Sequence, residues 1–154
     1  MKKSAEPRIH ISVAAQELTL KAGRKKLAAY PISTSSFGLG SEEGSMKTPT
    51  GRFRIAEKIG QGMPVGTVFK SRRPVKATKK LLRDEDLIMT RILWLEGVEV
   101  ANANTHDRFI YIHGTNHEER IGEPASHGCI RMRNADVAAL FEQVRIGTPV
   151  VIKA

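Results

Sequence analysis

Residues 112–132 contain two short motifs, Ile112-His113-Gly114-Thr115-Asn116 and Ser126-His127-Gly128-Cys129-Ile130-Arg131-Met132. Cys129 is the only cysteine among the 154 residues, so no disulfide can form within the chain. A free thiol has a pKa of about 8.5 and is a weak nucleophile at neutral pH unless a neighbouring imidazole accepts its proton. The pattern therefore predicts a nucleophilic Cys129 with His113 as its general base.

The two glycines that flank these residues suit the same chemistry. Gly128 permits an unusual backbone angle and a close approach of a substrate carbonyl. The backbone N–H groups of Cys129 and Gly128 are then candidate donors to an oxyanion. Gly114 has no side chain, so its carbonyl can lie against the His113 ring and fix the tautomer, in place of a triad carboxylate.

Other interpretations of these residues stay open. A lone cysteine is often a small buried apolar residue with no chemical role. Histidine and cysteine also bind zinc, and the candidate ligands are His113, His117, His127 and Cys129. The short His127-x-Cys129 pair differs from the spacing of structural zinc sites, so the nucleophile hypothesis is preferred, and no metal or organic cofactor is predicted.

The sequence around the motifs indicates a mainly β domain. Apolar residues alternate with polar ones in several short segments, and two strongly apolar runs resemble central strands. The expected strands are 9–13, 18–20, 27–33, 51–55, 87–95, 109–112 and 150–152, with a long loop at 35–51. One helix is clear at about 135–145, with Asn134 as its N-cap and Gly147 beyond its end.

Positive charge is concentrated in one part of the chain. The formal net charge is +9, and the segment 70–83 contains seven lysines and arginines and no acidic residue. This segment belongs to a basic, Gly/Pro-rich region around 58–86, which we expect to form an insertion or lid. A solvated surface is the simplest interpretation. Binding to an anionic envelope is an alternative, and nucleic acid is not expected because interleaved aromatic residues are lacking.

The two motifs, with Lys47-Thr48-Pro49-Thr50-Gly51-Arg52-Phe53-Arg54-Ile55, resemble the signature of the L,D-transpeptidase (YkuD-like) catalytic domain. The order of the expected strands and helix also fits this family over most of the chain. The resemblance implies a single-domain, β-sandwich-like L,D-transpeptidase fold spanning residues 1–154, with the active site in a cleft at the end of the sheets.

The resemblance also implies roles for individual residues. Cys129 is the nucleophile, His113 the base, Gly114 the source of the orienting carbonyl, and Gly128 part of the oxyanion hole. Arg131 either organises the cleft and meets a substrate carboxylate, or anchors the motif loop through a salt bridge. The remaining supporting or substrate-binding residues are Ser126, His127, Tyr111, Thr115 and Asn116.

The implied activity is a cysteine acyltransferase that acts on peptidoglycan stem peptides. Cys129 attacks the bond between diaminopimelate and D-alanine of a tetrapeptide, D-alanine leaves, and an amine of another stem or of an envelope protein resolves the thioester. The resemblance also implies roles in peptidoglycan biosynthesis, cell-wall biogenesis and cell shape. It further implies that carbapenems inhibit the protein. An L,D-carboxypeptidase, in which water resolves the thioester, and a non-catalytic module that binds the wall or a polyanion are the alternatives.

The location expected from the family is the cell envelope or periplasm. No apolar segment follows Met1-Lys2-Lys3, and no run of apolar residues is long enough to span a membrane. A cytoplasmic protein and a trimmed, mature form are therefore both compatible with the sequence.

Overall fold

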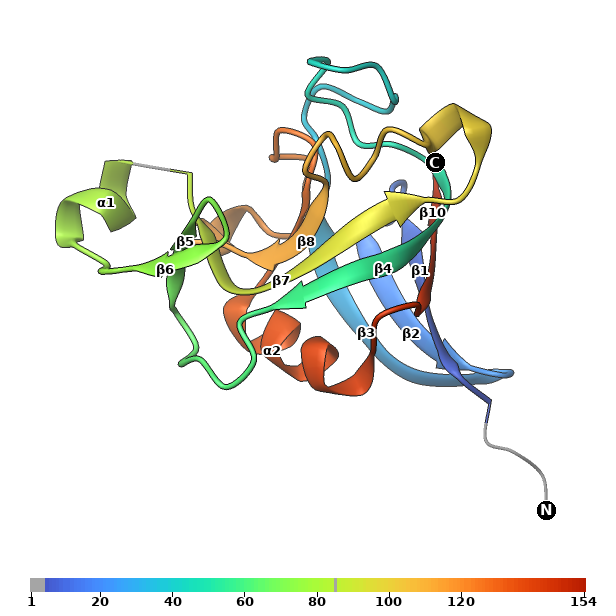
Figure 1. Cartoon of the computed structure of the whole chain (residues 1–154), viewed down its shortest axis with the longest axis horizontal. Coiled ribbons are helices and arrows are strands. Elements are labelled where there is room, and N and C mark those ends of the chain that lie inside the picture. Colours follow the sequence, from blue (N-terminus) through green and yellow to red (C-terminus); the bar gives the residue numbers. More distant parts are fainter. Residues whose placement is uncertain (1–4, 85) are drawn as a thin grey trace.

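The computed structural model describes residues 5–84 and 86–154. These residues form a mainly β domain with one main helix, as predicted (Figure 1). The elements in chain order are β1 (Pro7–Ser12), β2 (Glu17–Ala22), β3 (Lys25–Ser33), β4 (Gly51–Ile59), β5 (Val68–Lys70), β6 (Arg73–Val75), α1 (Lys79–Asp84), β7 (Ile88–Gly97), η1 (Val100–Asn102), β8 (Tyr111–Gly114), η2 (Glu118–Arg120), β9 (Ile130–Met132), α2 (Asn134–Gln143) and β10 (Pro149–Lys153).

The strands form one sheet that closes on itself. Its order is β4-β10-β1-β2-β3-β9-β8-β7-β5-β6, and a further pairing of β4 with β7 joins the two halves. Most neighbours are antiparallel, whereas β1 pairs with β10 and β8 pairs with β9 in parallel. The parallel β8–β9 pair is the part of the sheet that carries both sequence motifs.

Alternating apolar side chains fill the interior of this closed sheet. Ile9 and Ile11 of β1, Leu18 and Leu20 of β2, and Leu93 and Leu95 of β7 are buried and belong to one cluster. Helix α2 adds Val137, Leu140 and Phe141, all fully buried, to the same cluster. Burial of each such side chain contributes about 1.5–3 kcal/mol, so α2 is firmly fixed against the sheet. This helix in turn supports the strands that hold the site.

Most expected strands are confirmed, and two local predictions are wrong in detail. The strand expected at 109–112 begins at Tyr111, because Phe109 adopts a left-handed φ of 57°, and it continues through His113 and Gly114. Helix α2 begins at Asn134, and the N-cap is Arg133. Asn134 does not cap the helix because its side chain bonds instead to Thr90 and Thr115.

The basic segment projects beside the strands that carry the motifs (Figure 1). Strands β5 and β6 form a hairpin, and β5 pairs with the first residues of β7. Met89 of β7 pairs with Val68 on one side and with Gly114 on the other. The hairpin therefore lies next to the end of the sheet where His113 and Gly114 are found. In the described part of the chain, no helix has the length and apolar character needed to cross a membrane.

Candidate active site

The parallel pairing of β8 with β9 brings the two motifs together. His113 is the register partner of Arg131, and Cys129 immediately precedes β9. His113 and Cys129 both line a cavity of about 130 Å³. The other lining residues are Asp86, Ile88, Ser126, His127 and Arg131. His113 and Cys129 are 16 positions apart in the sequence, but they line one pocket because β8 and β9 are adjacent in the sheet.

The sulfur of Cys129 is held by backbone groups on the chain before and within β8. The N–H of Tyr111 donates to Sγ over 3.3 Å, and the thiol donates to the carbonyl oxygen of Phe109, also over 3.3 Å. Burial raises the pKa of the Cys129 thiol to about 11, although the Tyr111 N–H favours the thiolate. The resting thiol is therefore protonated at neutral pH, and it needs a base in order to react.

The ring of His113 is buried and bonded to its neighbour. Nδ1 lies 2.5 Å from the carbonyl oxygen of Gly114. A carbonyl only accepts hydrogen bonds, so Nδ1 carries the proton and Nε2 is left as the basic atom. Burial lowers the pKa of His113 to about 4, an effect that the bond to Gly114 partly opposes. The imidazole is therefore neutral at pH 7 and is able to accept a proton.

Gly114 is required by close packing. A Cβ atom at this position would lie 2.2 Å from Oδ1 of Asn134 and 2.7 Å from the carbonyl oxygen of Met89. Asn134 itself accepts a hydrogen bond from Thr90 and donates one to the carbonyl of Thr115. Any side chain at position 114 would push this network away from the His113 ring.

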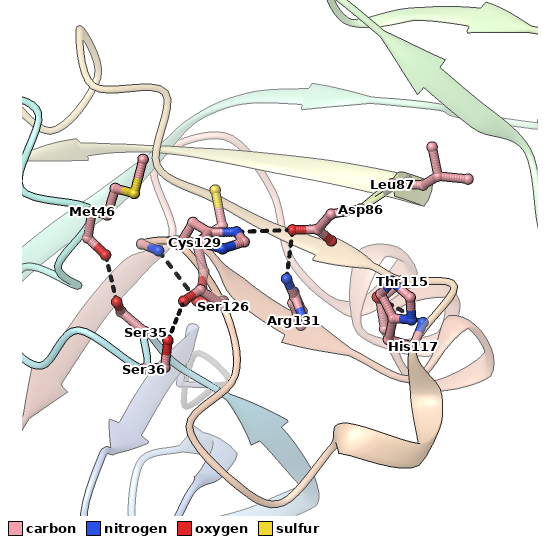
Figure 2. Close-up of polar contacts among 12 residues, drawn as sticks. Ser35, Ser36, Met46, Asp86, Leu87, Thr115, His117, Ser126, Cys129 and Arg131 are labelled. Atoms are coloured by element: carbon pink, nitrogen blue, oxygen red, sulfur yellow. Dashed lines mark hydrogen bonds and ion pairs between the residues drawn. The ribbon is translucent and has the colours of Figure 1, made fainter. Parts of the chain in front are cut away.

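A network of hydrogen bonds holds the loop before Cys129. The Ser126 hydroxyl donates to the carbonyl of Cys129 over 2.6 Å and accepts the Gly128 N–H over 3.3 Å (Figure 2). Thr48 Oγ1 donates to the carbonyl of Gly128 over 2.9 Å. Gly128 has a φ of +127°, which L side chains rarely adopt. In this arrangement the Gly128 N–H, a candidate oxyanion donor, is bonded to Ser126.

Asp86 is a member of the pocket that the sequence did not reveal. Its Oδ2 accepts hydrogen bonds from Arg131 over 2.5 Å and from Nδ1 of His127 over 3.1 Å (Figure 2). The Arg131 side chain is 5% exposed, so Asp86 neutralises a nearly buried charge. In the sequence Asp86 only follows a basic run, and nothing local connects it with Arg131. Of the two roles considered for Arg131, this ion pair matches the anchoring salt bridge.

Tyr111, Thr115 and Asn116 lie outside the lining of this pocket. Tyr111 packs edge-on against Trp94 at 5.4 Å and accepts a hydrogen bond from Arg72. Thr115 Oγ1 accepts the N–H of His117 (Figure 2).

The amide of Asn116 joins the site to the segment before β7. Its Oδ1 accepts from the N–H of Leu87, and its Nδ2 donates to the carbonyl of Leu82. These contacts lie close to Asp86 in the chain, so Asn116 helps to fix the segment that carries this carboxylate. Its contacts are those of a supporting residue.

The candidate zinc ligands do not converge. Across residues 5–84 and 86–154, no three His, Cys, Asp or Glu side chains are arranged to hold a metal ion. His113, His117 and His127 each direct Nδ1 to a different oxygen, on Gly114, Glu119 and Asp86 respectively. These three imidazole rings therefore have separate partners in the structure.

Comparison with known sequences yields a match over almost the whole chain. The family model for the L,D-transpeptidase catalytic domain, YkuD, matches residues 6–152. The Bacillus subtilis protein YkuD is 29% identical over 145 residues, which cover 94% of this chain and 64% of that protein. The Bacillus subtilis protein YqjB is 50% identical over 48 residues, 31% of this chain and 27% of that protein. Both are named as L,D-transpeptidases, and this chain spans less than two thirds of the length of each.

Solved structures show the same fold. An L,D-transpeptidase from Xylanimonas cellulosilytica aligns with a TM-score of 0.64 and 19% identity, over 99% of this chain and 63% of that one. L,D-transpeptidase 3 from Mycobacterium tuberculosis, solved with a faropenem-derived adduct, aligns with a TM-score of 0.62 and 16% identity, over 98% and 61% of the two chains. At these identities the likeness concerns the fold alone.

Proposed function

This chain belongs to the L,D-transpeptidase catalytic domain family, and we propose that it is a cysteine acyltransferase that acts on peptidoglycan stem peptides. The observation that carries the proposal is the shared pocket of Cys129 and His113, in which the His113 ring is neutral and its Nε2 is basic. A protonated thiol that shares a pocket with a neutral imidazole is a starting state for general-base catalysis.

Acylation begins when the Cys129 side chain turns from the Phe109 carbonyl into the pocket. Nε2 of His113 takes the thiol proton as Sγ attacks the carbonyl carbon between the third residue of the stem, diaminopimelate, and D-alanine. The tetrahedral intermediate collapses, His113 returns the proton to the leaving nitrogen, and D-alanine departs. A thioester between the stem and Cys129 remains.

The oxyanion of this intermediate needs nearby donors. The backbone N–H of Cys129 and that of Gly128 are the proposed pair, and removal of one such donor typically costs about 10²–10³-fold in rate. The Gly128 N–H is held by Ser126 at 3.3 Å, a long hydrogen bond that a charged oxygen would outcompete. Ser126 and His127 then support the loop, and Arg131 anchors it through Asp86.

An acceptor amine resolves the thioester. It attacks the thioester carbonyl, His113 removes its proton, and the thiol of Cys129 is regenerated with a new amide bond formed. Another stem peptide gives a cross-link, and an envelope protein gives a covalent attachment to the wall. The site of action in this proposal is the cell envelope, and the segment around 58–86 acts as a lid beside the cleft.

The test is incubation with a purified tetrapeptide stem, with and without an added amine donor. We expect D-alanine release by the wild-type protein and a new amide product when the amine is present. Product formed only with water would identify an L,D-carboxypeptidase with the same acyl-enzyme. Release of D-alanine by Cys129→Ala would overturn the assignment of the nucleophile.

A further inference from the structure

Three arginines near Cys129 differ in their partners. Arg131 is paired with Asp86. Arg108 donates to the carbonyls of Gly40 and Lys47 and to the Ser45 hydroxyl, so its donors are bound to a loop. The partners of Arg72 are a phenol and two aromatic rings, and no carboxylate pairs with it among the residues that the structure describes. Arg72 is therefore the arginine that is available to an anion.

Aromatic contacts hold the Arg72 side chain in place. Its guanidinium carbon lies 5.0 Å from the centre of the Trp94 ring and 5.4 Å from that of Phe109. Nη1 donates to the hydroxyl of Tyr111 over 3.3 Å. A guanidinium that lies over aromatic rings keeps its charge, and its remaining N–H groups keep the planar fork geometry that matches a carboxylate.

The backbone also favours this position. Ser71 and Arg72 form the turn between β5 and β6, with left-handed φ values of 48° and 65°. Such angles are unfavourable for residues other than glycine, and they persist where surrounding contacts determine the conformation. The hairpin turns toward the aromatic cluster, where the Arg72 side chain supplies those contacts.

Tyr111 connects Arg72 with the nucleophile. Its backbone N–H bonds to Sγ of Cys129, and its hydroxyl bonds to Arg72. Cys129 itself packs against the cluster that contains Trp94 and Tyr111. One tyrosine side chain therefore separates the attacking sulfur from the guanidinium.

We propose that Arg72 binds a carboxylate of the donor stem peptide and so selects the acyl donor. This inference rests on the proposed function, because a stem peptide carries a carboxylate on its terminal D-alanine and another on the side chain of diaminopimelate. Arg72 makes charge-assisted hydrogen bonds to that carboxylate.

The surrounding charge supports an anionic ligand. The segment 70–83 supplies seven positive charges, which leaves only +2 of the net +9 for the rest of the chain. Strand β6 and residues 76–80 are exposed, so this charge faces solvent beside Arg72. A concentrated positive field raises the local concentration of anions and the rate of their encounter.

The experiment compares Arg72→Gln with Arg73→Gln. Both substitutions remove one charge from the same hairpin, but Arg73 is an exposed strand residue. Each variant is assayed for release of the terminal residue from a tetrapeptide with a free C-terminus, from its C-terminal carboxamide, and from a stem with lysine in place of diaminopimelate. The two altered stems identify which carboxylate is bound.

We expect kcat/KM for the stem with both carboxylates to fall about 10- to 100-fold in Arg72→Gln, the range for a hydrogen bond to a charged group. The altered stem that lacks the bound carboxylate should already have a low kcat/KM with the wild-type protein. Its kcat/KM should fall little further in Arg72→Gln. Arg73→Gln should keep the wild-type preference. Equal losses on all three stems, equal losses in both variants, or no loss in Arg72→Gln would overturn the inference.

Failure of this inference is distinguishable from failure of the proposed function. If the wild-type protein releases the terminal residue equally well from all three stems, Arg72 does not select a carboxylate. The proposed acyl-transfer chemistry is then unaffected. A folded wild-type protein that releases nothing from any of them contradicts the proposed function itself.

Discussion

Nδ1 of His113 lies 2.5 Å from the carbonyl oxygen of Gly114, the next residue in the same strand. The contact assigns the proton of the neutral ring to Nδ1 and leaves Nε2 as the base. A carbonyl from the neighbouring residue thus does the orienting that a carboxylate does in a Ser-His-Asp triad. Because this partner is uncharged, it stabilises an imidazolium less than a carboxylate would, and burial keeps the pKa of His113 low.

Acylation of Cys129 should therefore be insensitive to pH over the neutral range. The pKa of His113 is about 4, so its ring stays neutral until the pH falls to that value, and the rate should then decrease about tenfold per pH unit. Because the thiol pKa is about 11, the rate should also show no further increase through thiolate formation as the pH rises from neutral to about 10. The measurement is the rate of adduct formation with a carbapenem between pH 3.5 and about 10.

Folding must be monitored across the same range. The lowered pKa of His113 means that the unfolded state binds more protons than the folded one between pH 6.5 and 4, so the protein loses stability as the pH falls through this window. Circular dichroism identifies the pH values at which the fold is intact. A decrease in rate centred near 6.5 in folded protein would contradict a buried, neutral His113.

Gly114→Ala should damage both the fold and the site. The new methyl group would meet Oδ1 of Asn134 at 2.2 Å, and displacement of Asn134 breaks its bonds to Thr90 and Thr115. We expect a loss of about 1–3 kcal/mol in the free energy of unfolding and a large loss of acylation rate. In the control, Gly122→Ala, a Cβ meets nothing within 4 Å, although the φ of +108° strains the backbone. This variant should lose stability through backbone strain and keep its acylation rate, so an equal loss of acylation rate in the two variants would show that packing at Gly114 is unimportant.

Thr48→Val should loosen the loop that carries Cys129. Thr48 is buried, donates to the carbonyl of Gly128 and accepts the N–H of Ser35. Valine has nearly the same shape but leaves both backbone groups without their partner, at a cost of about 1–3 kcal/mol. Thermal unfolding and acylation rate are measured beside Thr19→Val, where the hydroxyl makes one long contact to Glu17. Wild-type acylation in Thr48→Val would exclude Thr48 as a support of the loop.

Asp86→Asn should lower the pKa of the Cys129 thiol. The carboxylate raises that pKa by its negative charge, whereas Arg131 lowers it. Asparagine retains an acceptor for Arg131 and His127 but removes the charge, so the thiolate becomes easier to form. The pH dependence of alkylation by iodoacetamide reports the change, with the exposed Glu17→Gln as a control for net charge. A thiol pKa that is unchanged in Asp86→Asn would contradict electrostatic coupling across the pocket.

The sequence was most informative where the structure depends on neighbours in the chain. Alternation in Ile9, Ile11, Leu18 and Leu20 predicted the first hairpin, and these side chains are buried in the core. The two motifs predicted that His113 and Cys129 act together, and the parallel β8–β9 pairing places them at one pocket. Short-range periodicity and motif spacing contain that information.

Contacts between distant segments were not predictable from these patterns. Asp86 meets Arg131 across 45 positions, and Thr48 meets Gly128 across 80. Neither pair leaves a local signature, because the partners are joined only when the sheet closes. Asn134 was predicted as an N-cap from its local sequence preference. Its side chain instead forms hydrogen bonds with Thr90 and Thr115, which are distant in the sequence.

The central claim is that Cys129 is a nucleophile activated by His113, and intact-protein mass after incubation with a carbapenem tests it most directly. We predict one covalent adduct per chain on the wild-type protein, none on Cys129→Ala, and slow formation on His113→Gln. The three proteins are first shown to be folded and reduced. A folded wild-type protein without an adduct, or an adduct that persists in Cys129→Ala, would contradict the account.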